Sequence, residues 1–124
     1  MTEIVPSLAP QCAKISQMLS RIGDKWSVLV IMHLRRRSRR FSELKREVGD
    51  ISQRMLTLTL RNLERDGLVR RTVTPSTPPR VDYELTTLGH SLAGPVNELG
   101  TWVVEHSSDL ADAQARFDAK GSTV

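Results

Sequence analysis

Arginine side chains recur along one stretch of the chain at a spacing suited to binding a polyanion. Arg54, Arg61 and Arg65 lie within residues 51–67, and at about 100° per residue they share one face of a helix. A guanidinium group presents a fixed fork of donors that matches a phosphate or the O6 and N7 acceptors of guanine. This spacing predicts a helix that offers positive charge and bidentate donors to a nucleic acid.

The opposite face of this stretch is apolar, and both of its ends carry helix-boundary signals. The apolar stripe consists of Leu56, Leu60 and Leu63. Ser52 is a good N-cap, because its hydroxyl can accept from a free backbone N–H of the first turn. Gly67 stands where a left-handed residue would end the helix. A helix that is buried on its leucine side and exposes arginine on the other fits the major groove of DNA.

Basic charge is concentrated in the middle third of the chain. The 124 residues carry a net charge of +4, but residues 35–80 hold 13 Lys/Arg and 5 Asp/Glu, a net of +8, and the remainder has a net of −4. Positive charge gathered in one region is typical of proteins that bind a polyanion. Within this region, the run of arginines at residues 35–39 is expected to act only through long-range attraction.

Two helices are predicted ahead of this region, one over residues 11–22 and one from Lys25 to Arg36. Gly23 followed by Asp24 predicts a C′ glycine and then an N-cap between them. The second helix is apolar almost all round, so it belongs at the centre of the domain. Residues 1–10 are expected to form a flexible lead-in.

The arginine helix is the second half of a predicted helix-turn-helix. A short helix with apolar residues at helical spacing leads into it through Gly49, so the motif spans residues 41–66. After Gly67 the apolar period changes from about 3.6 to 2, which predicts a β-hairpin over residues 68–86. The sequence therefore predicts one mainly α domain over residues 1–124, a winged helix-turn-helix with a small β-hairpin.

Residues 87–118 are predicted to be helical, with a kink or a restart at Gly94 and Pro95, because proline lacks the N–H donor. Their apolar stripe has no obvious cover within a winged-helix core. Together with the first helix, it is therefore predicted to form a subunit interface. The residues expected in it are Ile15, Leu19, Ile22, Leu92, Val96, Leu99, Trp102 and Val103.

The sequence argues against several other classes of function. No run approaches the roughly 18 apolar residues of a membrane span, and the N-terminus lacks a signal-peptide pattern, so the protein is expected to be cytoplasmic. One cysteine cannot form an intramolecular disulfide or a zinc site by itself. The three histidines lack cysteines or clustered carboxylates at ligand or triad spacing, and no glycine-rich phosphate loop occurs. We expect no enzyme activity, no metal and no cofactor.

Five segments, in order along the chain, carry a specific resemblance to a known family. They are Ile22–Trp26, Arg40–Lys45, Ile51–Thr57, Leu60–Val69 and Pro78–Thr86, followed by Gly89 and Trp102. Together they resemble the HxlR-type bacterial transcriptional regulators, a branch of the winged helix-turn-helix proteins, over roughly residues 12–106. The resemblance implies a homodimer that binds double-stranded DNA, with the wing at the flanking phosphates or in the minor groove. The paired recognition helices would contact half-sites of a roughly palindromic operator about 34–36 Å apart.

Ten residues are predicted to contact DNA in this arrangement. The candidates for base edges and thymine methyl groups are Arg54, Arg61, Thr57 and Leu58. The candidates for phosphates are Ser52 and Gln53 at the helix N-terminus, then Arg40, Ser42, Lys45 and Arg80.

Two interpretations of Cys12 remain open. Many HxlR-type regulators carry a cysteine near the start of the first helix and respond to oxidants or electrophiles, and Cys12 occupies that place. A helix N-terminus and the nearby Lys14 also favour a thiolate. Oxidation would then form an intersubunit or mixed disulfide. The alternative is that Cys12 is a small buried hydrophobic residue.

The function of the whole chain also has an alternative to DNA binding. The chain could be a winged-helix protein-interaction module without specific DNA binding.

Overall fold

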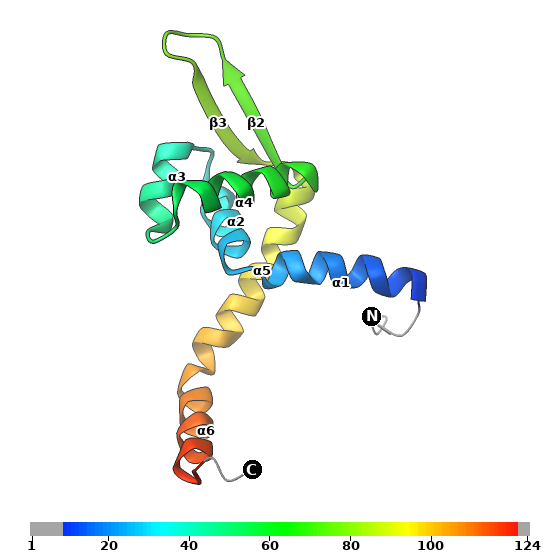
Figure 1. Ribbon diagram of the computed structural model, residues 1–124, viewed down its shortest axis with the longest axis vertical. Coiled ribbons are helices and arrows are strands. Elements are labelled where there is room, and N and C mark those ends of the chain that lie inside the picture. Colours follow the sequence, from blue (N-terminus) through cyan, green and yellow to red (C-terminus); the bar gives the residue numbers. More distant parts are fainter. Residues whose placement is uncertain (1–8, 122–124) are drawn as a thin grey trace.

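A helical body carries two projections, a β-hairpin at one end and a helical arm at the other (Figure 1). The computed structural model describes residues 9–121, and side chains from residue 13 onward. The helices are α1 (Ala9–Gly23), α2 (Lys25–Arg36), α3 (Phe41–Val48), α4 (Gln53–Arg65), α5 (Thr87–Glu105) and α6 (Ser107–Ala119). The strands are β1 (Arg39–Arg40), β2 (Val69–Thr74) and β3 (Arg80–Leu85). The predicted winged helix-turn-helix is confirmed.

The central helix of the body is α2, as its apolar sequence predicts. Val30, Ile31 and Leu34 are at most 1% exposed, and α2 contacts α1, α3, α4, α5 and β3. Burying each such side chain contributes about 1.5–3 kcal/mol. The rest of the domain is therefore organised around this helix.

The junction between α1 and α2 differs in part from its prediction. Asp24 is the N-cap of α2, and its carboxylate accepts from the Ser27 backbone N–H at 3.2 Å. Gly23, however, is still helical and lacks the positive φ of a C′ glycine. The reason is that α1 continues directly to the cap, with Asp24 N–H donating to the Arg21 carbonyl at 3.3 Å. Of the expected lead-in, Ala9 and the residue after it already belong to α1, and residues 1–8 lie outside the described residues.

Both ends of the arginine helix, α4, are confirmed. The Ser52 hydroxyl accepts from the Met55 backbone N–H at 3.0 Å. At the other end Gly67 has φ +75°, and the N–H of Leu68 donates to the Leu63 carbonyl at 3.0 Å, as in a Schellman ending. The helix therefore begins and ends where local sequence signals place its boundaries.

The sheet has one strand more than the sequence predicts. β2 and β3 form the wing hairpin, paired from Val69 opposite Leu85 to Thr74 opposite Arg80. The short strand β1 pairs antiparallel with β3, which gives the order β1-β3-β2. Two residues are too short to show a period of two, so the sequence pattern could not reveal β1.

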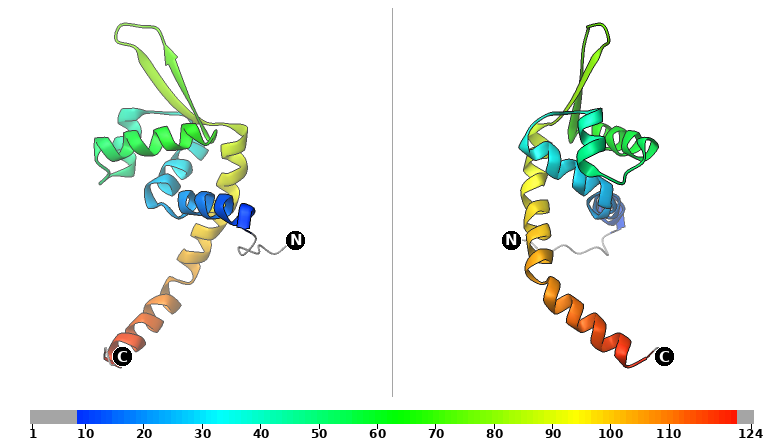
Figure 2. Two further views of the ribbon diagram at one scale, coloured as in Figure 1. Left: turned by 45° about the vertical axis from the view of Figure 1, so that its right-hand side comes forward. Right: turned by 90° about the vertical axis from the view of Figure 1, so that its left-hand side faces the viewer.

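The C-terminal helix is divided, but not at the proline. Pro95 lies inside α5, where the lost N–H removes one hydrogen bond from a helix of 19 residues. The division falls at His106, whose ring stacks on Trp102 with 4.4 Å between ring centroids. No residue of α6 is buried, and the arm formed by the end of α5 and α6 extends away from the body in both views of Figure 2. No described helix is long and apolar enough to cross a membrane.

Candidate nucleic-acid interface

The two faces of α4 are separated as the sequence predicts. Leu56, Leu60 and Leu63 are at most 1% exposed and belong to the core. On the other face, Leu58 is 51% exposed. The arginines on that face are also exposed: Arg54, Arg61 and Arg65. Burial of the leucines thus aims the guanidinium groups at solvent.

The arginines of this face keep their hydrogen-bond donors free. Among the described residues, Arg54, Arg61 and Arg65 have no hydrogen-bond or ion-pair partner. Thr57, on the same side of the helix, donates its hydroxyl to the Gln53 carbonyl at 2.9 Å. A guanidinium group without an internal partner can give all its donors to a ligand.

The predicted phosphate contacts of α3 and of the start of α4 lie at the surface. Ser42, Ser52 and Gln53 are exposed, and Lys45 is half-buried. Arg40 is exposed, and its backbone N–H donates to Glu43 Oε1 at 2.9 Å.

The wing arginines differ in their availability. Arg70 lies opposite Glu84, and the two form an ion pair of 3.3 Å. Arg80, predicted to contact phosphate, pairs with Asp82 of its own strand at 3.0 Å. Arg71 has no such partner among the described residues. The sequence suggested cross-strand pairing with Asp82 or Glu84 for both Arg70 and Arg71 and did not indicate Arg71 as a DNA contact, but only Arg70 forms such a pair.

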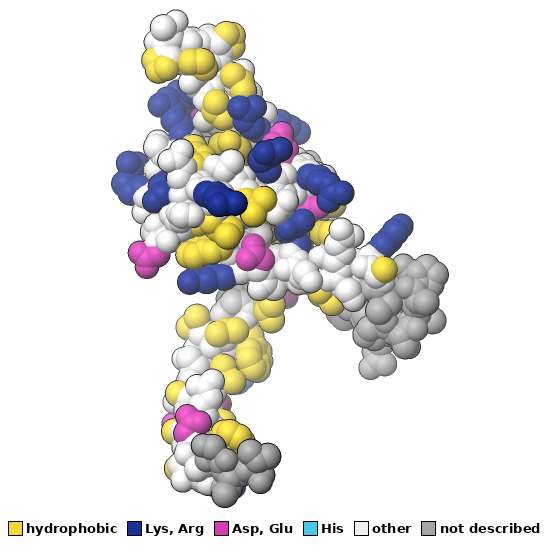
Figure 3. All heavy atoms as spheres, in the orientation of Figure 1, with side chains coloured by type: hydrophobic (Ala, Val, Ile, Leu, Met, Phe, Trp, Pro, Cys, Tyr) yellow, Lys and Arg dark blue, Asp and Glu magenta, His cyan; other side chains and the backbone are white. Residues whose placement is uncertain are grey.

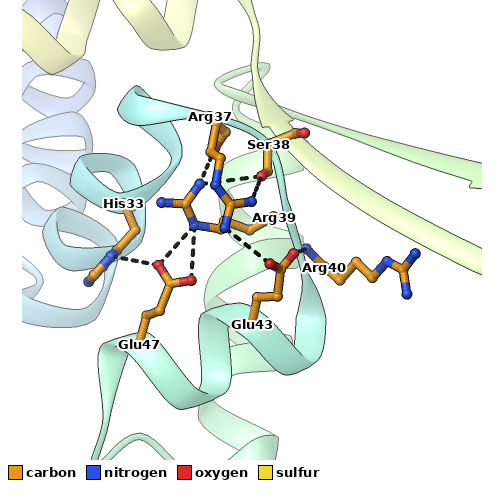
Figure 4. Close-up of polar contacts among 7 residues, drawn as sticks. All are labelled: His33, Arg37, Ser38, Arg39, Arg40, Glu43 and Glu47. Carbon is orange, nitrogen blue, oxygen red and sulfur yellow. Dashed lines mark hydrogen bonds and ion pairs between the residues drawn. The ribbon is translucent and has the colours of Figure 1, made fainter.

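The prediction that residues 35–39 act only by long-range attraction is wrong for two of them. Arg39 is 6% exposed, and its Nε donates to both carboxylate oxygens of Glu47, at 2.8 and 3.1 Å (Figure 4). Arg37 Nη2 pairs with Glu43 at 3.1 Å. The physical reason is that β1 lies against α3, so these side chains meet the acidic residues of that helix.

The ion pairs around α3 hold its carboxylates in the charged form. The hydrogen bond from Arg39 lowers the pKa of Glu47, with smaller contributions from the positive charges nearby. His33 Nδ1 of α2 lies 3.4 Å from the same carboxylate. The pKa of Glu43 is lowered first by the Arg40 backbone N–H and then by the Arg37 side chain. These contacts connect α3 to α2 and to the sheet.

Replacing Arg39 with methionine should therefore lower the free energy of unfolding by about 1–2 kcal/mol. The substitution removes the hydrogen bonds from the Arg39 guanidinium group to Glu47 and leaves that carboxylate without this partner. The Glu47 pKa lies below its ordinary value of 4.5. The pair thus contributes stability above that pH and loses it in stronger acid. We expect the difference in melting temperature between the variant and wild type, measured across pH 3–7, to become smaller as the pH falls.

The matched control is Arg36→Met, at an exposed position of the same arginine run. It should stay within about 0.5 kcal/mol of wild type. Equal effects of the two substitutions would contradict a structural role specific to Arg39.

The predicted interface residues mostly retain exposed surface, with one clear exception. Val96 is only 4% exposed, because α5 packs this side against α2, so it belongs to the subunit's own core. Leu92 is half-buried and packs partly against that core. The others are half-buried or exposed: Ile15, Leu19, Ile22, Leu99, Trp102 and Val103. Cys12 lies in the first turn of α1, and its side chain is outside the described residues.

Figure 3 shows how charge and apolar surface divide the molecule. Lys and Arg side chains gather over the body and the lower part of the hairpin, and apolar side chains lie along the arm below. The apolar side chains of the arm include Leu99 at 58%, Val104 at 73% and Phe117 at 73% exposed. One end of the molecule thus suits a polyanion and the other an apolar partner.

Comparisons with known proteins agree with this geometry. The family model described as HxlR-like helix-turn-helix matches residues 21–110. The HTH-type transcriptional regulator YtcD of Bacillus subtilis (strain 168) is 42% identical over 92 residues, which cover 74% of this chain and 73% of the relative. The solved structure of the redox regulator HypR in its reduced form superposes with a TM-score of 0.75 at 37% identity, over 80% of this chain and 98% of its own. Reduced YodB from B. subtilis has a TM-score of 0.66 at 36% identity, over 73% and 88%. The chain is a winged-helix protein that belongs to the HxlR-like helix-turn-helix family.

Proposed function

We infer that this protein is a transcriptional regulator that binds a specific DNA sequence by inserting α4 into the major groove. The observation that carries the proposal is the exposed face of α4, inside a segment of net charge +8. The arginines of this face have no hydrogen-bond or ion-pair partner in the described part of the chain. Relatives named as transcriptional regulators support it. A helix of this shape and charge matches the width of the major groove and its acceptor pattern.

Base reading is assigned to Arg54, because it lies in the first turn of α4 and its donors are free. The N-terminal residues of a recognition helix are those that reach base edges. Thr57 and the exposed Leu58 would provide apolar contact to thymine methyl groups. Arg61, the second base candidate, lies nearer the wing, where it lines a groove together with Arg71 and Tyr83.

Phosphate contacts would set the register of α4 on the duplex without reading sequence. The residues proposed for them are Arg40, Ser42, Lys45, Ser52 and Gln53. Arg80 is a weaker candidate than the sequence alone indicated, because its ion pair with Asp82 must open first.

The proposed active form is a homodimer built on α1, α5 and α6. Within residues 9–121, α6 has no buried residue, and the arm exposes several large apolar side chains. A contiguous apolar surface of this kind marks an interaction site in a water-exposed protein. A two-fold dimer would present two α4 helices to half-sites one helical turn apart.

Binding to duplex DNA from upstream of the protein's own gene tests the proposal, by fluorescence anisotropy at about 0.15 M salt with excess nonspecific competitor. We expect tight binding that survives the competitor and weakens steeply as salt rises. Binding lost to the competitor on every upstream duplex would favour the protein-interaction module instead.

Replacing Arg54 with alanine is expected to weaken operator binding by about 1–3 kcal/mol, while nonspecific binding changes little, because the lost contact is to a base. Arg36→Ala, at an exposed position away from α4, serves as the control. The check is the ratio of operator to nonspecific affinity for each variant. A uniform loss on both duplexes would assign Arg54 to phosphate.

Cys12 is proposed as an oxidant sensor. Two proteins with structures similar to this chain support this proposal: HypR is a redox regulator, and YodB is a transcriptional regulator solved in its reduced form. With one cysteine per chain, loss of two electrons and two protons from two thiols would form an intersubunit disulfide, or a mixed disulfide with a small thiol. Either bond would shift α1 and thereby the spacing of the α4 helices.

Treatment of the DNA complex with diamide is therefore expected to release wild-type protein and to leave the Cys12→Ser variant bound. Non-reducing electrophoresis would show a linked dimer, or mass spectrometry a small-thiol adduct, in wild type alone. A Cys12→Ser protein that still leaves its operator under diamide would disprove the sensor role without affecting the DNA-binding proposal.

A further inference from the structure

A groove of about 340 Å³ lies between α4 and the base of the wing. Its lining residues are Thr57, Leu60, Arg61, Glu64, Arg71 and Tyr83. Leu60 is 1% exposed, and Tyr83 packs partly against the core, so these two close the groove on its inner side. The walls carry two guanidinium groups and one carboxylate, which gives the groove a net positive charge.

Strand alternation explains why Arg71 faces this groove. Side chains two residues apart in a strand point to the same face of the sheet, and Val69 of β2 is 2% exposed, so that face is turned toward the core. Arg71 therefore shares the face of Val69 and lies opposite Tyr83. Arg70 occupies the other face, where it pairs with Glu84.

The two arginines of the groove have no counter-ion among the residues that the structure describes. Each of the other two wing arginines pairs with an acidic residue of β3. Arg61 and Arg71 pair with no described residue, and Glu64 forms no ion pair with either. Two uncompensated guanidinium groups at one groove form a site for an anion with several oxygen acceptors.

We propose that Arg61 and Arg71 together hold one phosphate of the DNA backbone in this groove. The inference rests on the proposed entry of α4 into the major groove. A helix in the major groove is flanked by the phosphates that line the groove edges, and this groove lies on the flank of α4 that faces the wing. Arg61 is then a phosphate contact, Arg54 remains the base reader, and the wing contributes through Arg71 rather than through Arg80.

The test compares Arg71→Ala with Arg70→Ala, its paired neighbour on the opposite face of the strand. Affinities for operator and nonspecific duplexes are measured over a range of salt. Arg71→Ala is expected to weaken binding to both duplexes by the same factor, roughly 10-fold. It should also reduce the magnitude of the slope of log affinity against log salt concentration by about 1. Arg70→Ala should change affinity less than about 2-fold, because an exposed paired charge contributes little. Thermal unfolding confirms that both variants are folded.

Two further measurements are specific to a shared phosphate. The double variant Arg61→Ala/Arg71→Ala should lose less than the product of the single losses, because both side chains serve one anion. Glu64→Gln should tighten binding of both duplexes, since it removes a negative charge from beside the phosphate. Methylphosphonate substitution along the operator should find one position per half-site that weakens binding of wild type and has no effect on binding of the double variant Arg61→Ala/Arg71→Ala.

The outcomes separate this inference from the proposed function. Wild type that binds DNA while Arg71→Ala binds equally well would overturn the phosphate site alone. A loss confined to the operator would also overturn it, because that pattern belongs to a base contact. A wild-type protein that binds no duplex at all would remove the proposed function, and the phosphate site with it.

Discussion

Replacing Gly89 with alanine is expected to lower the free energy of unfolding by about 3 kcal/mol, because the added methyl group overpacks a closely packed contact. A Cβ at Gly89 would collide with the carbonyl oxygen of Leu68 and would lie 3.1 Å from Leu85 Cδ2. That carbonyl cannot move freely, because it accepts the Thr86 backbone N–H at 3.1 Å. The extra carbon must therefore push α5 away from the end of α4.

The consequence reaches the DNA-binding end, because this contact lies where α5 packs on residues beside and within the wing strands, Leu68 and Leu85. Thr86 caps α5 by accepting from the Gly89 backbone N–H at 3.0 Å, and it donates its hydroxyl to the Gly67 carbonyl at 2.6 Å. We expect Gly89→Ala to lose operator affinity as well as thermal stability, when both are measured at one protein concentration.

Gly23→Ala is the matched control for this prediction. Both glycines are helical and neither has a positive φ, but a Cβ at Gly23 would meet nothing within 4 Å. Alanine should therefore be neutral or should stabilise by up to about 1 kcal/mol through helix propensity. Equal destabilisation by both substitutions would contradict the packing argument at Gly89.

Leu99→Glu is expected to convert the proposed dimer to a monomer. Leu99 is 58% exposed in the single subunit, and glutamate is a good helix former, so the subunit itself should stay folded. In the proposed dimer the carboxylate would be buried against apolar side chains, which would cost about 3 kcal/mol or more of the free energy of dimerisation. The dissociation constant of the dimer should rise at least about 100-fold, and operator binding should fall with it because the two half-sites are no longer engaged together.

Sedimentation equilibrium of the wild type and the variant measures this effect directly. Thr87→Glu, an exposed position in the first turn of α5, adds the same charge away from the arm and should leave the dimer intact. A Leu99→Glu protein that remains dimeric would place the interface elsewhere. Unchanged circular dichroism in both variants excludes unfolding as the cause.

The parts of this fold that could be predicted from sequence are those with local signals. Ser52 and Gly67 mark the ends of α4, and its leucine period separates a buried face from an exposed one, so the candidate interface followed from one segment. The hairpin followed from the change of period after Gly67. Each of these features depends on residues within a few positions of one another.

The features that were missed depend on distant partners. From the sequence alone, Arg39 is predicted to be one more surface cation. In the structure, β1 pairs with β3, and the Arg39 side chain meets Glu47. Val96 belongs to an apolar stripe, and only the packing of α5 on α2 separates it from the exposed members. The boundary between α5 and α6 at His106 has no glycine or proline that could predict it from the sequence, whereas Pro95 lies inside α5.

Selection of bound duplexes from a random library by the reduced protein tests sequence-specific recognition by α4 without assuming an operator. We expect the bound pool to converge on an inverted repeat with half-sites about 10–10.5 base pairs apart, centre to centre. We also expect Arg54→Ala to lose base preference at one position of each half-site. A pool that binds but keeps the base composition of the starting library would contradict sequence-specific recognition by α4.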